Sequence, residues 1–367
     1  MCLRPIALVV LWASLLAGTA GGEEIRFDAD RWTWQAQEWR VEEHLGRQSL
    51  YLLNGQAWID GLRLEDGEVE FDVAFTPERG FVGGVFRHQD AGNYEHFYLR
   101  PHQSANDDAN QYTPVFDGSS AWQLYHGPSY ATPIEYPFDQ WIHIRIVFAG
   151  GQADIYVDSD EPVLSVDLRR SSAAGSVGLS ANLAEAHFSR FAYREASRTD
   201  LRGQPVPEPA PPAGSVMEWR VSSPFAEAGL SDVTELSAAE LNALSWSKLA
   251  AGATGITNLA RPGRDSREAN TVLAETTIRA TTTRVQRVQF GYSDRVRVYA
   301  NGRLVYAGDN GYRSRDYRFL GTIGLFDEVY VSLRPGENQL VFAVSEDFGG
   351  WGLQAVIPAR AAISPDR

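Results

Sequence analysis

The segment 94–102 carries the side chains with the most chemistry, and its pattern is that of a β-strand. Because successive side chains of a strand point to opposite faces, Glu95, Phe97 and Leu99 are expected on one face. The other face gathers two phenol rings, two imidazoles and one guanidinium, from Tyr94, His96, Tyr98, Arg100 and His102. Flat rings can stack on a ligand, and the polar ends offer directional hydrogen bonds. We therefore predict a ligand-binding face here, with an ordinary wet sheet face as the alternative.

Aromatic residues further along the chain are placed to extend this face. Trp122 and Tyr125, together with Tyr130, are predicted to widen the stacking surface. Burial of the rings between two sheets is the alternative, and we expect it more for Trp122 than for Tyr130.

Three acidic residues occupy alternate positions of an earlier strand-like segment: Glu68, Glu70 and Asp72. They share one face, with neighbouring Cα atoms roughly 6.6 Å apart at the usual rise of a strand. Two carboxyl groups about 5 to 5.5 Å apart are the arrangement of a retaining glycosidase, so catalysis by these acids is one hypothesis. The alternative, which we favour, is that they neutralise Arg87 and Arg100 on an adjacent strand.

His96 is the fourth catalytic candidate, because an imidazole titrates near neutral pH and a carboxylate can hold its tautomer. With His102, Arg100 and the acids above, it could form a general acid–base site. A zinc site is not indicated, since His96 and His102 stand on a predicted strand and loop, unlike a helical ligand pair. The sequence contains no nucleophile elbow and no phosphate-binding loop.

The loop 104–111 is rich in hard oxygen donors, as a calcium site would be. Asp107, Asp108 and Asn110 are the candidate ligands, and ordinary turn chemistry is the alternative. No other cofactor is predicted from the sequence.

The composition of the whole chain limits its partners. A net charge of −14 disfavours nonspecific binding to nucleic acid or anionic membranes, and it leaves neutral partners such as poly- or oligosaccharides open. Residues 1–20 have the plan of a signal peptide, with Arg4, an apolar run at 6–16 and small residues up to Ala20. We expect a secreted or periplasmic protein without membrane insertion. The one cysteine, Cys2, lies in this segment, so a mature protein would have no disulfide.

Short alternating segments without helical periodicity follow, which favours antiparallel β-sandwiches. The strands predicted for the first domain are residues 67–75, 81–88, 94–100, 113–116, 121–125, 141–148 and 153–157. A proline-rich run at 204–212 cannot pair in a sheet, so we place a linker at 197–215. The prediction is an all-β protein of two jelly-roll sandwiches, at 24–196 and 216–358.

The C-terminal part has one strong hairpin signal at 295–306, where Asn301 and Gly302 can take the positive φ angles of a type I′ turn. Further strands are expected at 329–333 and 339–344. A short connecting helix is expected at 237–244, since its first residues have capping-box spacing.

Two polar clusters stand out in this second part. The charged run 313–318 is interpreted as a solvated face or an interdomain salt-bridge network. Glu346, Asp347 and Trp351 form a second candidate edge for a sugar, although the glycines around them equally indicate tight packing of a closing strand.

Several motifs together resemble concanavalin A-like lectin/glucanase domains, including laminin-G-like ones: GEVEFD at 67–72, YEHFYLR at 94–100, WQLY at 122–125, and Trp141 followed by YVD at 156–158. The resemblance covers about residues 24–195, and it implies a jelly roll whose concave face receives carbohydrate. The C-terminal part resembles the galactose-binding-like β-sandwich, an accessory module of secreted glycosidases, through FGYSD at 290–294 and SEDFGGWG at 345–352.

Enzymes of similar fold suggest what catalysis would require. Family 16 glycoside hydrolases carry Glu-x-Asp-x-(x)-Glu, whereas this sequence has Glu-x-Glu-x-Asp at 68–72, with the acid types in other places. The 3-keto-disaccharide hydrolase domain is a second enzymatic resemblance. The leading hypothesis is a carbohydrate-binding protein without catalysis, with its ligand on the concave face of the first domain. A glycoside hydrolase, or a structural or protein-interaction module of the cell envelope, are the alternatives.

Overall fold

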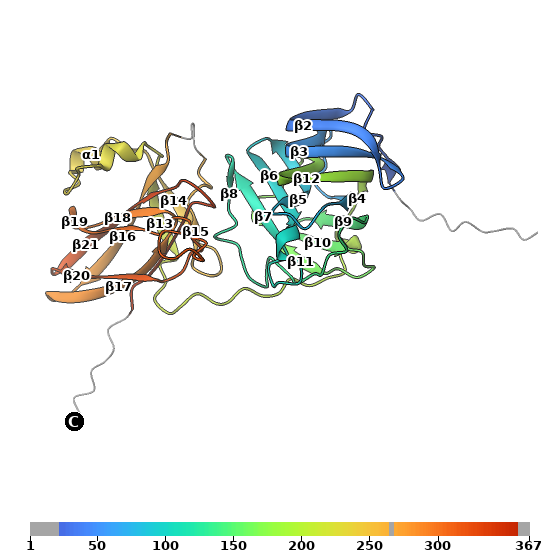
Figure 1. The fold of residues 1–367 in the computed structure, drawn as a ribbon. Helices are drawn as coiled ribbons and strands as arrows, with labels where there is room; N and C mark the ends of the chain where they lie inside the picture. The colour runs from blue at the N-terminus through green and yellow to red at the C-terminus, as the bar shows by residue number, and fades with distance from the viewer. Residues whose placement is uncertain (1–21, 264–267, 359–367) are drawn as a thin grey trace, which may run out of the picture.

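The fold is that of a computed structural model which describes residues 22–263 and 268–358. Strands dominate it and form two antiparallel sandwiches that stand side by side (Figure 1), which confirms the predicted all-β class. The predicted signal peptide lies outside the described residues. No helix in the described part of the chain is long and apolar enough to cross a membrane.

The N-terminal sandwich is a 12-stranded curled sheet. Its strands are β1 (Glu23–Glu24), β2 (Trp32–His44), β3 (Arg47–Ile59), β4 (Gly67–Ala74), β5 (Phe81–Asp90), β6 (Asn93–Leu99), β7 (Asn110–Phe116), β8 (Ser119–Ser120), β9 (Ile142–Ala149), β10 (Gln152–Val157), β11 (Leu164–Asp167) and β12 (Ser176–Glu195). The strand order is β11-β10-β9-β4-β12-β5-β6-β7-β8, with β1 and β3 paired to β12 and β2 beside β3. Single turns of 3-10 helix follow β6 (Pro101–Gln103) and β12 (Arg198–Asp200).

Strand β12 belongs to both layers of this sandwich. Its residues 176–182 pair with β5, whereas its residues 187–195 pair with β4. Leu183 and Arg190 adopt positive φ angles of 64° and 53° at two of the points where the register of β12 shifts. These bulges bend the strand, so that β5 to β8 diverge from β4 and β9 to β11 and one sheet becomes two facing layers.

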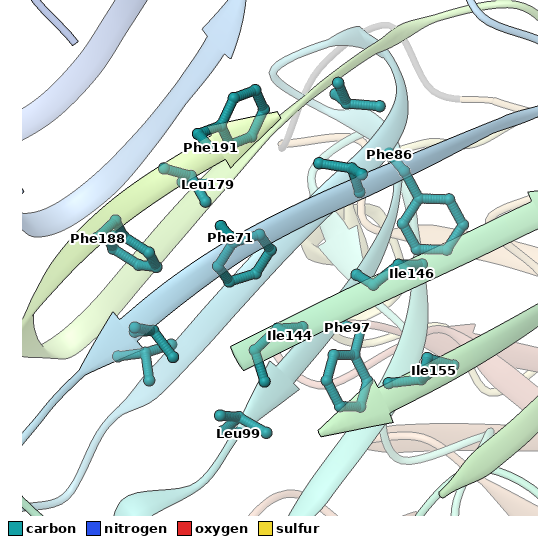
Figure 2. Packing of buried hydrophobic residues seen from close by; sticks show 14 of the residues in the cluster. Phe71, Phe86, Phe97, Leu99, Ile144, Ile146, Ile155, Leu179, Phe188 and Phe191 are labelled. Atoms are coloured by element: carbon teal, nitrogen blue, oxygen red, sulfur yellow. The ribbon is translucent and has the colours of Figure 1, made fainter. Parts of the chain in front are cut away.

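Apolar side chains from the two layers meet between them (Figure 2). Phe71 of β4 lies edge-on to Phe188 of β12, with ring centroids 5.8 Å apart. Phe86 of β5 lies 5.0 Å from Phe148 of β9, so this contact crosses from one layer to the other. All four rings are completely buried. Burying a side chain of this size stabilises a fold by roughly 1.5–3 kcal/mol.

The C-terminal sandwich has two separate sheets, ordered β14-β13-β16-β21-β18-β19 and β15-β22-β17-β20. Its strands are β13 (Glu218–Ser222), β14 (Trp246–Ala250), β15 (Thr257–Asn258), β16 (Thr271–Ala280), β17 (Arg284–Tyr292), β18 (Arg295–Ala300), β19 (Arg303–Asp309), β20 (Asp327–Leu333), β21 (Gly336–Ser345) and β22 (Gly352–Val356). Phe342 lies at the centre, 5.5 Å from Trp219 and 5.4 Å from Phe290. The helix α1 (Ala238–Asn242) and a 3-10 turn (Glu227–Leu230) precede β14.

Two local predictions in this domain are confirmed. Asn301 and Gly302 join β18 to β19 with φ angles of 50° and 84°, as a type I′ turn requires. The Ser237 hydroxyl accepts the N–H of Glu240 at the start of α1, and the N–H of Ser237 donates to the Glu240 carboxylate, which completes the capping box.

The predicted strand at 121–125 is wrong. The backbone N–H groups of Leu124 and Tyr125 both donate to the carbonyl of Ala121, which closes a turn. The N–H of Ala121 still donates to Pro114 of β7, but that of Gln123 donates to the carbonyl of Gly349 in the other sandwich.

The proline-rich segment between the sandwiches contains no strand but is bound to the first of them. Asp154 Oδ2 accepts the backbone N–H of Gly203 at 2.8 Å. Further along, Glu208 pairs with Arg169 at 2.7 Å and accepts the hydroxyl of Tyr130. The segment is therefore held at two points, as a fixed strap along the N-terminal sandwich.

Burial predicts a contrast between two valines. Val73 of β4 is completely buried, whereas Val285 of β17 is 63 % exposed. Val73→Ala should lower the free energy of unfolding of its sandwich by roughly 2 kcal/mol, because two buried methyl groups are lost. Val285→Ala should change that of its own sandwich by less than about 0.5 kcal/mol. Denaturant titrations followed by circular dichroism would measure both, and equal effects would contradict the assigned core.

Candidate ligand-binding face

Five neighbouring strands, β3, β12, β5, β6 and β7, present one continuous surface on the side away from the core. Two rows of paired residues cross it: Gln56, Ser180, Gly83, Tyr98 and Gln111 form one, and Trp58, Gly178, Val85, His96 and Thr113 form the next. The small residues Ser180 and Gly83 lie within the first row and Gly178 within the second, with larger side chains next to them. A Cβ atom on Gly83 or Gly178 would overlap the backbone of a neighbouring strand, so neither position accepts a larger residue.

Seven rings on this surface form an unbroken chain of contacts, which we call the aromatic face. Its members are Trp58, His88, Tyr94, His96, Tyr98, Phe81 and His102. Trp58 is stacked on His88 at 4.4 Å, and the centroids of the other successive rings lie between 4.9 Å and 5.9 Å apart. Such distances are those of favourable aromatic pairs.

The strand 94–102 supplies most of these rings, but they lie deeper than a wet sheet face would. Tyr94, His96 and Tyr98 expose only 9 %, 6 % and 4 % of their surface. Trp58 and Phe81 are partly exposed, so they are the rings that a ligand would meet first. Neither was singled out from the sequence, because their place beside β6 depends on pairing between strands far apart in the chain.

The opposite side of β6 faces the core. Phe97 and Leu99 pack there, as the alternation predicts. Glu95 shares this side, fully buried, and accepts the hydroxyl of Tyr112 at 2.7 Å. Burial raises the pKa of Glu95, so this carboxyl group belongs to the interior of the sandwich and not to the ligand face.

The three imidazoles of the aromatic face add little charge to it. Burial lowers the pKa of His88 to about 4 and that of His96 to about 3, and it lowers the pKa of His102 as well. These rings are therefore neutral at pH 7, when each offers one donor and one acceptor. Arg100, the cation of the face, is paired with Asp108 at 2.7 Å. The face thus presents polar groups with little net charge.

Four buried polar atoms on or beside the aromatic face have no hydrogen-bond partner within the described residues: Gln56 Oε1, His88 Nε2, Arg100 Nε and His102 Nδ1. Buried polar groups in proteins are nearly always paired, since leaving one unpaired costs about 1–3 kcal/mol. Unpaired buried polar atoms also occur elsewhere in the described residues, so these four add to the description of the aromatic face only together with its rings.

Arg100 and Tyr98 also belong to a buried network that leads away from the face. The hydroxyl of Tyr98 donates to Gln111 Oε1 at 3.0 Å, and Arg100 Nη2 donates to the same oxygen. Gln111 Nε2 then donates to the carbonyls of Trp122 and Tyr125, at 3.1 Å and 2.6 Å. The network links the two side chains to the loop that follows β8.

Of the downstream aromatic residues, Trp122 and Tyr130 have the reverse of the expected exposure. Tyr130 is buried, because its ring lies beside Tyr112 and its hydroxyl donates to Glu208 of the strap. Trp122 is partly exposed and lies edge-on to Phe348 of the C-terminal sandwich, with ring centroids 5.9 Å apart. The hydroxyl of Tyr125 accepts a bond from a C-terminal side chain, that of Asn258. Trp122 and Tyr125 therefore line the boundary between the sandwiches.

The acidic residues of β4 lie on the other side of the core. They alternate along β4 with the core residues Val69, Phe71 and Val73. Their side chains therefore lie on the face of β4 that is turned away from the core. Glu68 pairs with Arg194 through two bonds of 3.1 Å and 2.6 Å, and with Arg145 at 3.5 Å. The pairing partners predicted from the sequence were wrong, because β4 lies between β9 and β12 and not beside β5 or β6.

Asp72 is engaged in a separate ionic cluster. Its carboxylate bonds Arg47 and lies 2.7 Å from His143 Nδ1, while His143 Nε2 lies 3.9 Å from Glu70. Burial raises the pKa of Asp72, but the bonds from His143 and Arg47 outweigh it and hold that pKa below its usual value. The bond to Asp72 in turn raises the pKa of His143.

His96, the fourth catalytic candidate, does not meet these acids. Its Nε2 lies 2.7 Å from the hydroxyl of Ser180, on the face across the core from β4. Within the described residues, the acids and His96 therefore form two separate sites, and the acid–base constellation considered from the sequence is not assembled.

The three candidate calcium ligands lie in different environments. Asp107 is exposed, Asp108 pairs with Arg100, and the buried Asn110 bonds the backbone of Thr132 through both ends of its amide. No group of three or more His, Cys, Asp or Glu side chains that could hold a metal ion occurs in the described part of the chain.

The second candidate sugar edge has structural partners. Trp351 is buried and donates its indole N–H to the carbonyl of Val344 at 3.0 Å. Asp347 pairs with Arg295, and Glu346 accepts the hydroxyl of Ser119 at 2.9 Å. The charged run 313–318 is exposed, with Arg318 paired to Asp316 at 3.1 Å.

Comparisons with known proteins identify no family. No protein-family model matches the sequence, and no curated protein matches it. Solved structures similar to part of the chain include the carbohydrate binding module CBM66 from Bacillus subtilis, with 18% identity, a TM-score of 0.36, and coverage of 45% of this chain and 96% of that chain. A putative glycosyl hydrolase from Parabacteroides distasonis is 12% identical, with a TM-score of 0.32 and coverage of 45% and 88%. A Bacillus subtilis protein of unknown function with a galectin-like fold is 10% identical, with a TM-score of 0.33 and coverage of 45% and 89%. Likenesses at this level assign neither a family nor a ligand.

The buried imidazoles predict how stability depends on pH. The unfolded chain binds protons at histidine near pH 6.5, whereas His88 in the folded state does so only near pH 4. Because the unfolded state binds more protons between these values, the free energy of unfolding should fall as the pH is lowered from 7 to 5. His88→Gln should reduce this fall, as measured by denaturant titration at each pH.

His143 provides the matched control with the opposite sign. Its raised folded-state pKa stabilises the protein below the unfolded value, and that contribution is lost as the pH rises through the folded value. His143→Gln should therefore make the acid-induced fall steeper. A His88→Gln profile parallel to that of the original protein would show that His88 is not buried in its neutral form.

Proposed function

We propose that this protein binds a neutral carbohydrate on the aromatic face of its N-terminal sandwich and does not catalyse a reaction on it. The observation that carries the proposal is the chain of seven rings together with the four unpaired polar atoms beside them. Ring faces pack against the apolar C–H surfaces of a sugar, while amide, imidazole and guanidinium groups bond its hydroxyls. Both kinds of group are needed, and both occur here.

The charge of the face favours a neutral ligand over an anionic one. His88 and His96 are neutral at pH 7, and the guanidinium of Arg100 is already paired with Asp108. The chain as a whole carries a net charge of −14, which repels polyanions. A neutral poly- or oligosaccharide satisfies the unpaired donors and acceptors without bringing in an uncompensated charge.

The positions of the acidic residues favour binding without catalysis. A retaining glycosidase needs two carboxyl groups on either side of one bond of the substrate. Here Glu68 and Asp72 are engaged by arginine and histidine side chains, across the core from the aromatic face. The proposed ligand would therefore not lie between the carboxylates of β4.

Domain assignment and export belong to the same proposal. We propose that residues 24–196 form a concanavalin A-like domain and residues 216–358 a galactose-binding-like domain, and that residues 1–20 direct the protein to the periplasm or the medium. The motifs quoted from the sequence support this assignment, as does the gathering of buried residues into separate clusters at 25–191 and 216–355.

Removing one ring from the aromatic face tests the function. Trp58→Ala should weaken binding to the best ligand from a panel of neutral oligosaccharides by about tenfold, which corresponds to roughly 1.4 kcal/mol of lost stacking. Trp39→Ala is the matched control, because Trp39 is 43 % exposed on β2 but lies outside the aromatic face, stacked on Trp34. Isothermal titration calorimetry on the full chain would measure both affinities.

Two results would contradict the proposal. Absence of binding to every glycan in a broad array would remove its basis, as would equal losses in the two tryptophan variants. Release of sugar from a glycoside panel that disappears in Glu70→Gln would show instead that the protein is a hydrolase. A protein partner captured without any glycan would favour an interaction module of the cell envelope.

A further inference from the structure

The loop 121–125 crosses from the N-terminal sandwich into the C-terminal one. Gln123, completely buried, donates its backbone N–H to the carbonyl of Gly349 at 2.9 Å and accepts the N–H of Ile323 at 3.1 Å. Its side-chain amide donates to the carbonyl of Leu320 at 2.6 Å. Three backbone groups of the C-terminal sandwich therefore bind one residue of the other sandwich.

Glycines of the C-terminal sandwich make room for this loop. Gly321 and Gly349 have φ angles of +79° and +97°, and a Cβ atom on either would overlap the side-chain amide of Gln123. A Cβ atom on Gly350 would lie 2.7 Å from the Cα of Ala121. This surface is shaped closely around the loop, which a chance contact between two domains would not require.

The inner end of the same loop reaches the aromatic face. The carbonyls of Trp122 and Tyr125, on either side of the docked Gln123, accept both bonds from Gln111 Nε2. The other end of that amide, Gln111 Oε1, accepts bonds from Tyr98 and Arg100. One side chain, almost fully buried, thus joins the docked loop to the proposed ligand-binding residues.

We propose that the C-terminal sandwich serves as the scaffold that sets the geometry of the aromatic face, with Gln111 as the positioning residue. Docking of Gln123 fixes the two carbonyls, these fix the orientation of the Gln111 amide, and the amide holds Tyr98 and Arg100. As far as affinity is concerned, this inference rests on the proposed carbohydrate binding. Coupling of this kind is reciprocal, so a bound ligand should strengthen the docking of the two sandwiches by the same factor.

Gly349→Ala in the full chain tests the scaffold. The added methyl group would collide with the Gln123 amide, so hydrogen exchange in the loop 121–125 should become at least about tenfold faster. Gly336→Ala is the matched control, because Gly336 has nearly the same φ angle, +100°, with nothing within 4 Å of its Cβ position. Both variants place an alanine at nearly the same positive φ angle, and only Gly349→Ala also collides with Gln123.

Two further measurements on the same variants test whether a disturbed loop 121–125 also changes the aromatic face. The side-chain amide resonances of Gln111 in an NMR spectrum should shift in Gly349→Ala and stay in place in Gly336→Ala. The affinity for the best neutral oligosaccharide should fall several-fold in Gly349→Ala alone. If Gly349→Ala does not fold, Gln123→Ala replaces it, since it removes the side-chain bond to Leu320 and the packing of the amide against Gly321 and Gly349 but keeps the backbone hydrogen bonds of the loop.

The outcomes separate this inference from the proposed function. A freed loop with unchanged Gln111 resonances and unchanged affinity would overturn the scaffold and leave carbohydrate binding intact. If the original protein binds no carbohydrate, the proposed function fails, and the Gln111 resonances still decide whether docking sets the face. Gln111→Glu keeps an acceptor for Tyr98 and Arg100 but loses the Nε2 donor, so it should reproduce the faster loop exchange. A loop that exchanges as slowly as before would contradict the role of Gln111.

Discussion

The bend in strand β12 is the constraint on which the N-terminal sandwich depends. Its two halves pair with β5 and with β4, so the two layers can face each other only if the strand turns between residues 182 and 187. Leu183 takes up that turn with a positive φ angle, and its N–H is bonded by the side chain of Asn54 on β3 at 2.9 Å. A positive φ angle is costly for leucine, and the fixed hydrogen bond offsets part of that cost.

Strand β12 also supplies the small residues in the middle of the surface that carries the aromatic face. Gly178 and Ser180 lie between β3 and β5, where they keep Trp58 and Gln56 on one side apart from His96 and Tyr98 on the other. Ser180 also bonds His96, which keeps that imidazole satisfied while neutral. One strand therefore supplies the bend between the layers, the small residues between β3 and β5, and the hydrogen-bond partner of the buried His96.

The sequence reveals features that depend on local alternation, but not those that depend on pairing between distant strands. The alternation in 94–100 is a local property, and it correctly separates Phe97 and Leu99 from Tyr94, His96 and Tyr98. Trp58 and Phe81 join the same face through β12, more than 90 residues further along the chain. The partners of Glu68 are of the same kind, since they depend on β4 lying beside β9 and β12. Neighbours of this kind cannot be predicted from the spacing of residues within one strand.

The glycine-rich end of the C-terminal sandwich shows why some sequence signals stay ambiguous. The segment 345–352 has the composition of a ligand loop, and the same glycines also fit close packing. In the fold, Gly349 and Gly350 lie against the loop 121–125, and Trp351 fills the core beneath them. The groups that bind this loop are main-chain carbonyls and N–H groups, which every residue type except proline possesses. Because such contacts leave no trace in residue type except the missing side chain, the joint between the sandwiches can be recognised only once both of its surfaces are in place.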